Sequence, residues 1–104
     1  MITKEVKTKV IEEVFYLMFW AQIIERLVDE DDGTAEAKTR LKNARGFRNS
    51  HRYALGVLCD IFHLNYVELC DYAKNVYSRG MDIEAFAKWM SVKDFVHMFK
   101  EDKK

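Results

Sequence analysis

Six basic side chains, with no carboxylate among them, lie in the segment between Ala37 and Cys59: Lys38, Arg40, Lys42, Arg45, Arg48 and Arg52. The chain as a whole has no net charge, and the residues up to Glu36 hold four basic against nine acidic ones. The positive charge is therefore concentrated in one segment. Such a concentration is typical of contact with a polyanion, either nucleic acid or an acidic face of another protein.

The side chains of Cys59, His63 and Cys70 are of the kinds that bind zinc. Cys59 and His63 are four residues apart and share one helical face, whereas Cys70 falls on the next predicted helix. A tetrahedral site needs a fourth ligand, which Asp60 or His97 would have to supply. No two cysteines are closely spaced, and a buried free cysteine commonly packs as a small apolar residue. We therefore predict no metal and no cofactor, and reduced thiols.

No group of residues indicates catalysis. The histidines His51, His63 and His97 are scattered, and no serine or cysteine has the sequence context of a nucleophile. The carboxylates of Asp29–Asp32 are typical of a solvated helix end and lack the spacing of a calcium loop. Alternatively, they neutralise the basic segment. We predict that the protein is not an enzyme.

Composition favours a single all-α domain over residues 1–104. Apolar residues make up 49% of the chain, proline is absent and there are four glycines, so long helices are allowed. The most apolar stretch, Val14–Ile24, is too short to span a bilayer. The N-terminus lacks the order of a signal peptide. We expect a cytoplasmic protein without membrane contact, folded as a compact bundle of about five to six helices.

The spacing of apolar residues predicts where these helices begin and end. A long helix from about Thr3 to Asp31 is apolar on most sides, which is typical of a central core helix or of a homodimer contact. Thr34 is expected to cap a second helix that ends at Gly46, and Ser50 or Asn49 to cap a third. The expected buried side of the third helix consists of Tyr53, Ala54, Val57, Leu58, Ile61 and Phe62.

Three further helices are predicted after residue 63. Asn65 and Glu68 form a capping-box-like pair for a helix that ends near Gly80. Its expected inward residues are Val67, Cys70, Ala73 and Tyr77. Asp82 is expected to cap a short helix that reaches Met90. Ser91 and Asp94 are expected to open the last helix, whose inward residues would be Val92, Phe95, Val96 and Phe99.

The segment from Ala54 to Ala73 can form a helix-turn-helix. Cys59 would be its small buried residue, Leu64 the apolar residue of the turn, and His63 would take a left-handed conformation where glycine is common. The expected packing partners are Leu58, Phe62, Leu69 and Tyr72. The residues Phe47, Val57-Leu58-Cys59, Phe62, Leu64-Asn65 and Tyr66-Val67 give residues 47–73 a resemblance to small phage and prophage-encoded helical proteins. The resemblance implies a regulatory or DNA-associated role and carries no defined binding residues.

The leading hypothesis is a phage-type regulatory protein that binds nucleic acid. Arg45, Arg48 and Arg52 would hold phosphates, with Lys38, Arg40 and Lys42 strengthening the field. Asn65, Tyr66, Lys74 and Asn75 would reach the groove. The predicted recognition helix also carries Glu68 and Asp71 early, and two carboxylates there repel phosphate.

The rival hypothesis is a protein-binding inhibitor or adaptor, for example a phage factor such as an anti-CRISPR or host-takeover protein acting on a host enzyme or defence complex. The basic segment would then dock on an acidic protein surface. Candidate anchors are Tyr66, Tyr77 and Trp89, because aromatic residues dominate interface energetics. A homodimer through the first helix is compatible with both hypotheses.

Overall fold

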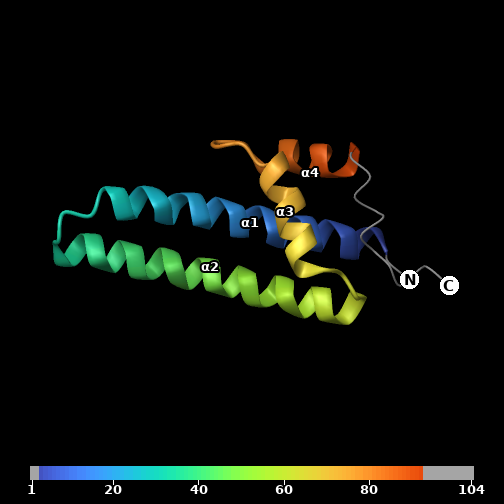
Figure 1. The fold of residues 1–104 in the computed structure, drawn as a ribbon, viewed down its shortest axis with the longest axis horizontal. Coiled ribbons are helices and arrows are strands. Elements are labelled where there is room, and N and C mark those ends of the chain that lie inside the picture. The colour runs from blue at the N-terminus through green and yellow to red at the C-terminus, as the bar shows by residue number, and fades with distance from the viewer. Residues whose placement is uncertain (1–2, 93–104) are drawn as a thin grey trace.

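The fold consists of α-helices throughout the part of the chain that the computed structural model describes, residues 3–92. Helix α1 spans Lys4–Asp29, α2 spans Ala35–Phe62, α3 spans Tyr66–Val76 and α4 spans Ile83–Val92. The two long helices form a hairpin, and α3 and α4 pack near the end of it that holds the start of α1 (Figure 1). The all-α prediction is confirmed. None of these helices combines the length and hydrophobicity needed to cross a bilayer.

Helix α1 is the centre of this arrangement, because its contacts with the other three helices are the most extensive in the fold. The main core gathers side chains from every helix: Val10, Ile11, Val14, Phe15, Leu17, Leu55, Cys59, Leu64, Leu69, Ala73, Phe86 and Met90. A smaller cluster of Ile24, Leu41 and Ala44 holds the far end of the hairpin together. That end extends beyond α3 and α4, and the molecule measures 55 × 24 × 20 Å.

Three of the four helices, α2, α3 and α4, begin at a cap that the sequence predicted. Thr34 Oγ1 accepts a hydrogen bond from the amide of Ala37 at 3.1 Å, and Asn65 Oδ1 accepts one from the amide of Glu68 at 2.9 Å. Asp82 Oδ1 likewise accepts from Ala85 N at 2.8 Å. These bonds satisfy backbone donors that have no partner inside a helix, which is why the starts could be read from local sequence.

The turn after α2 also follows the prediction. His63 has φ 59° and ψ 40°, which is the left-handed conformation expected for it. The amide of Leu64 donates to the carbonyl oxygen of Cys59 at 2.9 Å and closes the helix end. Cys59, Leu64 and Leu69 are all buried, at the offsets that the sequence indicated.

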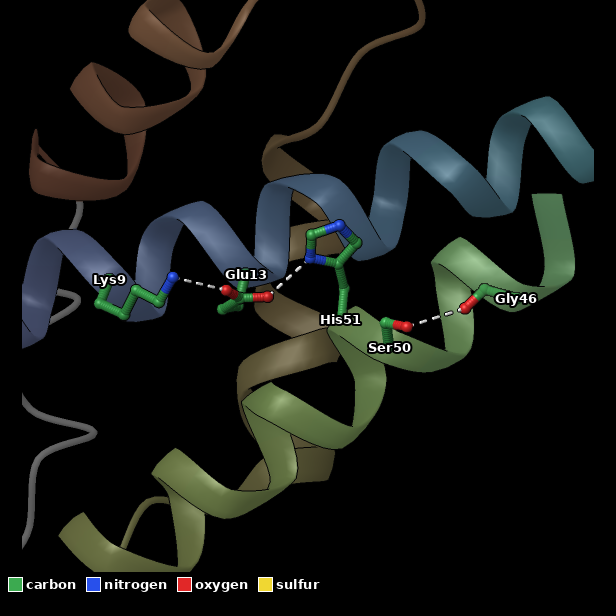
Figure 2. A network of polar contacts seen from close by, with 5 residues as sticks. All are labelled: Lys9, Glu13, Gly46, Ser50 and His51. Carbon is green, nitrogen blue, oxygen red and sulfur yellow. Dashed lines mark hydrogen bonds and ion pairs between the residues drawn. The ribbon is translucent and has the colours of Figure 1, made fainter. Parts of the chain in front are cut away.

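The predicted break at Gly46 is wrong, and α2 continues as one helix of 28 residues. A glycine inside a helix costs only about 1 kcal/mol relative to alanine. Buried Leu41 and Ala44 before it and Leu55 after it pack on the same side of α2, and this burial outweighs that cost. Ser50 does not cap a new helix, since its hydroxyl donates to the carbonyl oxygen of Gly46 at 3.1 Å (Figure 2).

The predicted number of five to six helices is therefore not confirmed, and the described residues form four. Ser91 lies inside α4 instead of opening a further helix, and the remainder of the predicted last helix lies outside the described residues. The expectation that the first helix is apolar on most sides is not confirmed either. Ala21 and Val28 of α1 are exposed.

The continuity of α2 also changes which of its side chains face the core. Tyr53, Val57 and Ile61 were expected to be buried, yet they are 77%, 38% and 59% exposed. Leu55 and Cys59 are buried instead, because they continue the stripe that Leu41 and Ala44 begin. On α3, Val67 is exposed where burial was predicted, and Leu69 and Ala73 are buried.

Candidate binding surface along α2

Four of the six predicted basic residues form a row along one side of α2. Lys38, Lys42, Arg45 and Arg52 follow the spacing i, i+4, i+7 and i+14, which keeps them on one face of a helix. The first three, together with Asn49, line a shallow hollow that also includes Asp31. Within the described residues, none of these four cations takes part in an ion pair. We call Lys38, Lys42, Arg45 and Arg52 the cation row.

Arg40 and Arg48 are not part of the cation row. Arg40 lies on another side of α2, in a separate hollow with Thr39. The pKa of Asp32 is lowered mainly by hydrogen bonds from Thr34, and the charge of Arg40 makes a smaller contribution in the same direction. Arg48 follows buried Ala44 by four residues and is half-buried. Its Nη2 donates to Asn49 Oδ1 at 3.3 Å, while its buried Nε has no hydrogen-bond partner among the described residues. Helical spacing within the predicted second helix separates Arg40 from Lys38 and Lys42. The position of Arg48 relative to the row depends on the continuity of α2 through Gly46.

The four residues of α3 and its cap that were predicted to reach a groove do not all lie near the cation row. Tyr66 lies near the end of the cation row, and burial raises the pKa of its phenol while the charge of Arg52 acts in the opposite direction. Asn65 uses its side-chain oxygen to cap α3. Lys74 lines a hollow against α1 with Gln22 and Tyr77, and Asn75 is exposed. Tyr66 is therefore the one member of this group that adjoins the cation row.

A larger open hollow, of about 850 Å³, adjoins the row where α2 meets the start of α3. Its lining is mostly apolar and consists of Tyr53, Gly56, Val57, Cys59, Leu64 and Tyr66. Its polar rim consists of Asn49, Arg52 and Asp60. A methyl group built on Gly56 would meet no atom within 4 Å, so the missing side chain of Gly56 leaves the helix backbone as the floor of the hollow. We call this feature the Gly56 hollow.

Exposed apolar side chains continue from the Gly56 hollow along α2. Tyr53, Val57 and Ile61 are spaced four residues apart and form a stripe on the outer side of the helix. The other predicted anchors lie elsewhere: Trp89 is 51% exposed on α4, and the hydroxyl of Tyr77 donates to Gln22 Oε1 at 2.9 Å. The outer side of α2 thus combines a row of positive charges with an apolar hollow and stripe.

Carboxylates also lie within and near this surface, and Asp60 is on the rim of the Gly56 hollow. Asp31 shares the first hollow with Lys38 and Lys42, which agrees with the alternative that the Asp29–Asp32 cluster offsets part of the basic segment. Glu68 and Asp71 are exposed on α3.

A buried polar cluster that the sequence did not predict joins α1 to α2. Glu13 is 6% exposed, and its carboxylate contacts Lys9 Nζ at 2.9 Å and His51 Nδ1 at 2.7 Å (Figure 2). His51 also stacks on Tyr16, with ring centroids 5.2 Å apart. Burial disfavours the ionised carboxyl, but the hydrogen bonds from His51 and Lys9 outweigh it and lower the pKa of Glu13. We interpret the pair as a structural connection between the two helices.

Cys59 and Cys70, which were considered as zinc ligands, are free thiols. Cys59 is buried and Cys70 is half-buried. Burial raises the pKa of Cys59 to about 11 and also raises the pKa of Cys70. Among the described residues, no three histidine, cysteine or acidic side chains come close enough to hold a metal ion. His97, one of the proposed fourth ligands, lies outside the described residues.

Comparison of the chain with protein-family models, with curated protein sequences and with solved structures gave no match. The physical features of the surface on α2 are therefore the basis for a functional proposal.

Proposed function

We propose that this chain is a non-enzymatic protein that binds another protein through the outer side of α2, as an inhibitor or adaptor does. The observation that carries the proposal is that the cation row and the Gly56 hollow are adjacent on the outer side of α2, where Arg52 belongs to both. Protein interfaces characteristically combine an apolar centre with a charged rim, and tyrosine and arginine are enriched in them. Both residue types occur here, in Tyr53 and Arg52.

Nucleic-acid binding is the second candidate, and the cation row is the observation that favours it. Four cations without paired carboxylates would contact phosphates along a groove. This function uses neither the hollow nor the apolar stripe, and Glu68 and Asp71 on α3 oppose phosphate there. The phage-type origin and a homodimer through α1 stay predictions.

Photo-crosslinking in cells that produce the chain tests the protein-binding function. A photoreactive amino acid at Asn49, between the row and the hollow, should form a discrete protein adduct. The same amino acid at Lys88, which is exposed on α4, serves as the control site. The double variant Lys42→Glu/Arg45→Glu should abolish the adduct, and Arg40→Glu, on the other side of α2, should keep it. Identical adducts from both sites would contradict the proposal.

Fluorescence anisotropy with labelled random duplex and single-stranded DNA separates the second candidate from the first. Nucleic-acid binding through the row would weaken steeply with salt, by roughly one log unit per phosphate contact for each tenfold change. Lys42→Glu/Arg45→Glu would reduce that slope, whereas Arg40→Glu would not. The absence of DNA binding at low salt would remove this candidate.

A further inference from the structure

Building on the protein-binding function proposed above, we propose that the Gly56 hollow and the neighbouring part of α2 bind an amphipathic α-helix of the partner. That helix inserts a large apolar side chain over Gly56 and presents carboxylates to Arg45 and Arg52.

The shape of the surface favours a helix as the bound element. Tyr53, Val57 and Ile61 are separated by four residues each and form one ridge on α2. Ridges of this kind pack into the grooves between side chains of a second helix. An extended peptide is instead captured by adding to the edge of a sheet, and the described residues contain no strand.

The floor of the Gly56 hollow favours one large apolar anchor. Nothing lies within 4 Å of the position that a Cβ of Gly56 would occupy. The lining also includes the buried side chains of Leu64 and Cys59 and the more exposed ones of Val57 and Tyr66. A leucine or aromatic side chain inserted there would cover helix backbone and apolar side chains together, which is the setting of most energetic hot spots.

The positive charge of the arginines beside the hollow predicts acidic side chains along one edge of the bound helix. Arg52 is on the rim of the hollow and Arg45 lies two turns earlier on the same side of α2. Neither has an ion-pair partner among the described residues, although the carboxylate of Asp60 shares the rim of the hollow with Arg52. Acidic side chains on one edge of the partner helix would complement both arginines. A nucleic acid would satisfy the arginines but would leave the apolar ridge in water, so a protein helix is the better fit.

The test is a selection from a library of random peptides displayed on phage, with the full chain as the target. Peptides of about 18 residues are long enough, because a helix rises about 1.5 Å per residue and residues 45–61 span about 24 Å. Selected peptides should show apolar residues at helical spacing and an excess of Asp and Glu along one edge. A selection that enriches no sequence, or sequences with a basic edge, would overturn the inference.

Variants then locate the site of the selected peptide by fluorescence anisotropy. Gly56→Leu, which fills the hollow, and Arg52→Glu should each weaken binding by at least about tenfold. Tyr53→Ala, at a side chain that is 77% exposed, removes part of the ridge without touching the core and should also weaken binding. The controls are Arg40→Glu and Val28→Ala, a charged and an exposed apolar position outside this surface, and both should bind as the wild type does.

The outcomes distinguish this inference from the protein-binding function. If Gly56→Leu and Tyr53→Ala leave peptide binding unchanged, the helix-binding site proposed here is wrong. The protein-binding function would still stand if crosslinking from Asn49 gave an adduct that depends on the cation row. Displacement of the peptide by random duplex DNA, with loss of DNA binding in Gly56→Leu, would assign the surface to nucleic acid and overturn both proposals.

Discussion

The Nδ1 atom of His51 lies 2.7 Å from Oε1 of Glu13, and this contact joins α1 to α2 across 38 positions of the sequence. The carboxylate is almost fully buried, and Lys9 on the preceding helical turn is its other cationic partner. A buried carboxylate is tolerated only when it is paired and hydrogen-bonded. The pair therefore favours one relative position of the two long helices, and with it the side of α2 that carries the candidate binding surface.

Replacement of His51 by alanine should destabilise the fold. It leaves the carboxylate of Glu13 buried with Lys9 as its remaining cationic partner, so the free energy of unfolding should fall by about 2 kcal/mol. Urea denaturation followed by circular dichroism measures this. Lys9→Ala is the matched control, because the Lys9 side chain is 56% exposed and such pairs contribute at most about 1 kcal/mol. Equal stability of the two variants would contradict a structural role of the His51 contact.

The contribution of Glu13 should depend on pH in a defined direction. The pKa of Glu13 in the folded chain lies below its ordinary value of 4.5, so the ionised carboxylate stabilises the fold above that pH. This stabilisation is lost as the pH falls through the folded pKa. The difference in unfolding free energy between wild type and Glu13→Gln should therefore shrink below pH 4.5. Urea denaturation at a series of pH values checks this, and a difference that grows on acidification below pH 4.5 would refute it.

Alanine at the two helical glycines should stabilise the chain. Gly46 and Gly56 lie inside α2, and a Cβ at either position meets nothing within 4 Å. Each substitution should raise the free energy of unfolding by about 0.5–1 kcal/mol. Gly33→Ala and Gly80→Ala should destabilise instead, because these glycines have φ near +80°. Thermal melts of the four variants would show the opposite signs, and a common sign would disprove the assignment of α2 as continuous.

Asn65 should prove to be a structural cap of α3. Asn65→Ala removes the acceptor for the amide of Glu68 and should lower stability by about 1 kcal/mol. Asn65→Asp keeps an acceptor at this position and should retain most of the stability. Chemical denaturation of the three proteins tests the order. If the alanine variant is as stable as the wild type, Asn65 is available for the groove contact that the sequence first indicated.

Cys59 should resist alkylation in the folded chain. Its pKa of about 11 leaves roughly one thiol in a thousand ionised at pH 8, and the side chain is 4% exposed. Iodoacetamide should therefore modify Cys59 far more slowly in buffer than in urea, as followed by mass spectrometry of tryptic peptides. Rapid labelling of Cys59 without denaturant would show that the Gly56 hollow opens further in solution.

Local sequence determined the helical class of this protein, the starts of its helices and the turn at His63. The caps at Thr34, Asn65 and Asp82 could be predicted because each hydrogen bond joins residues three positions apart. The left-handed conformation of His63 could be predicted because His63 occupies the turn position of the helix-turn-helix pattern where glycine is common.

Tertiary structure alone decided whether α2 continues through Gly46 and which of its sides is buried. Local propensity favours a stop at glycine, but burial of Leu41 and Leu55 against the rest of the fold lies beyond a local window and outweighs it. That single helix places Tyr53, Val57 and Ile61 outside and separates Arg48 from the cation row. The pairing of Glu13 with His51 likewise depends on how α1 and α2 pack, since no local spacing connects residues so far apart in the chain.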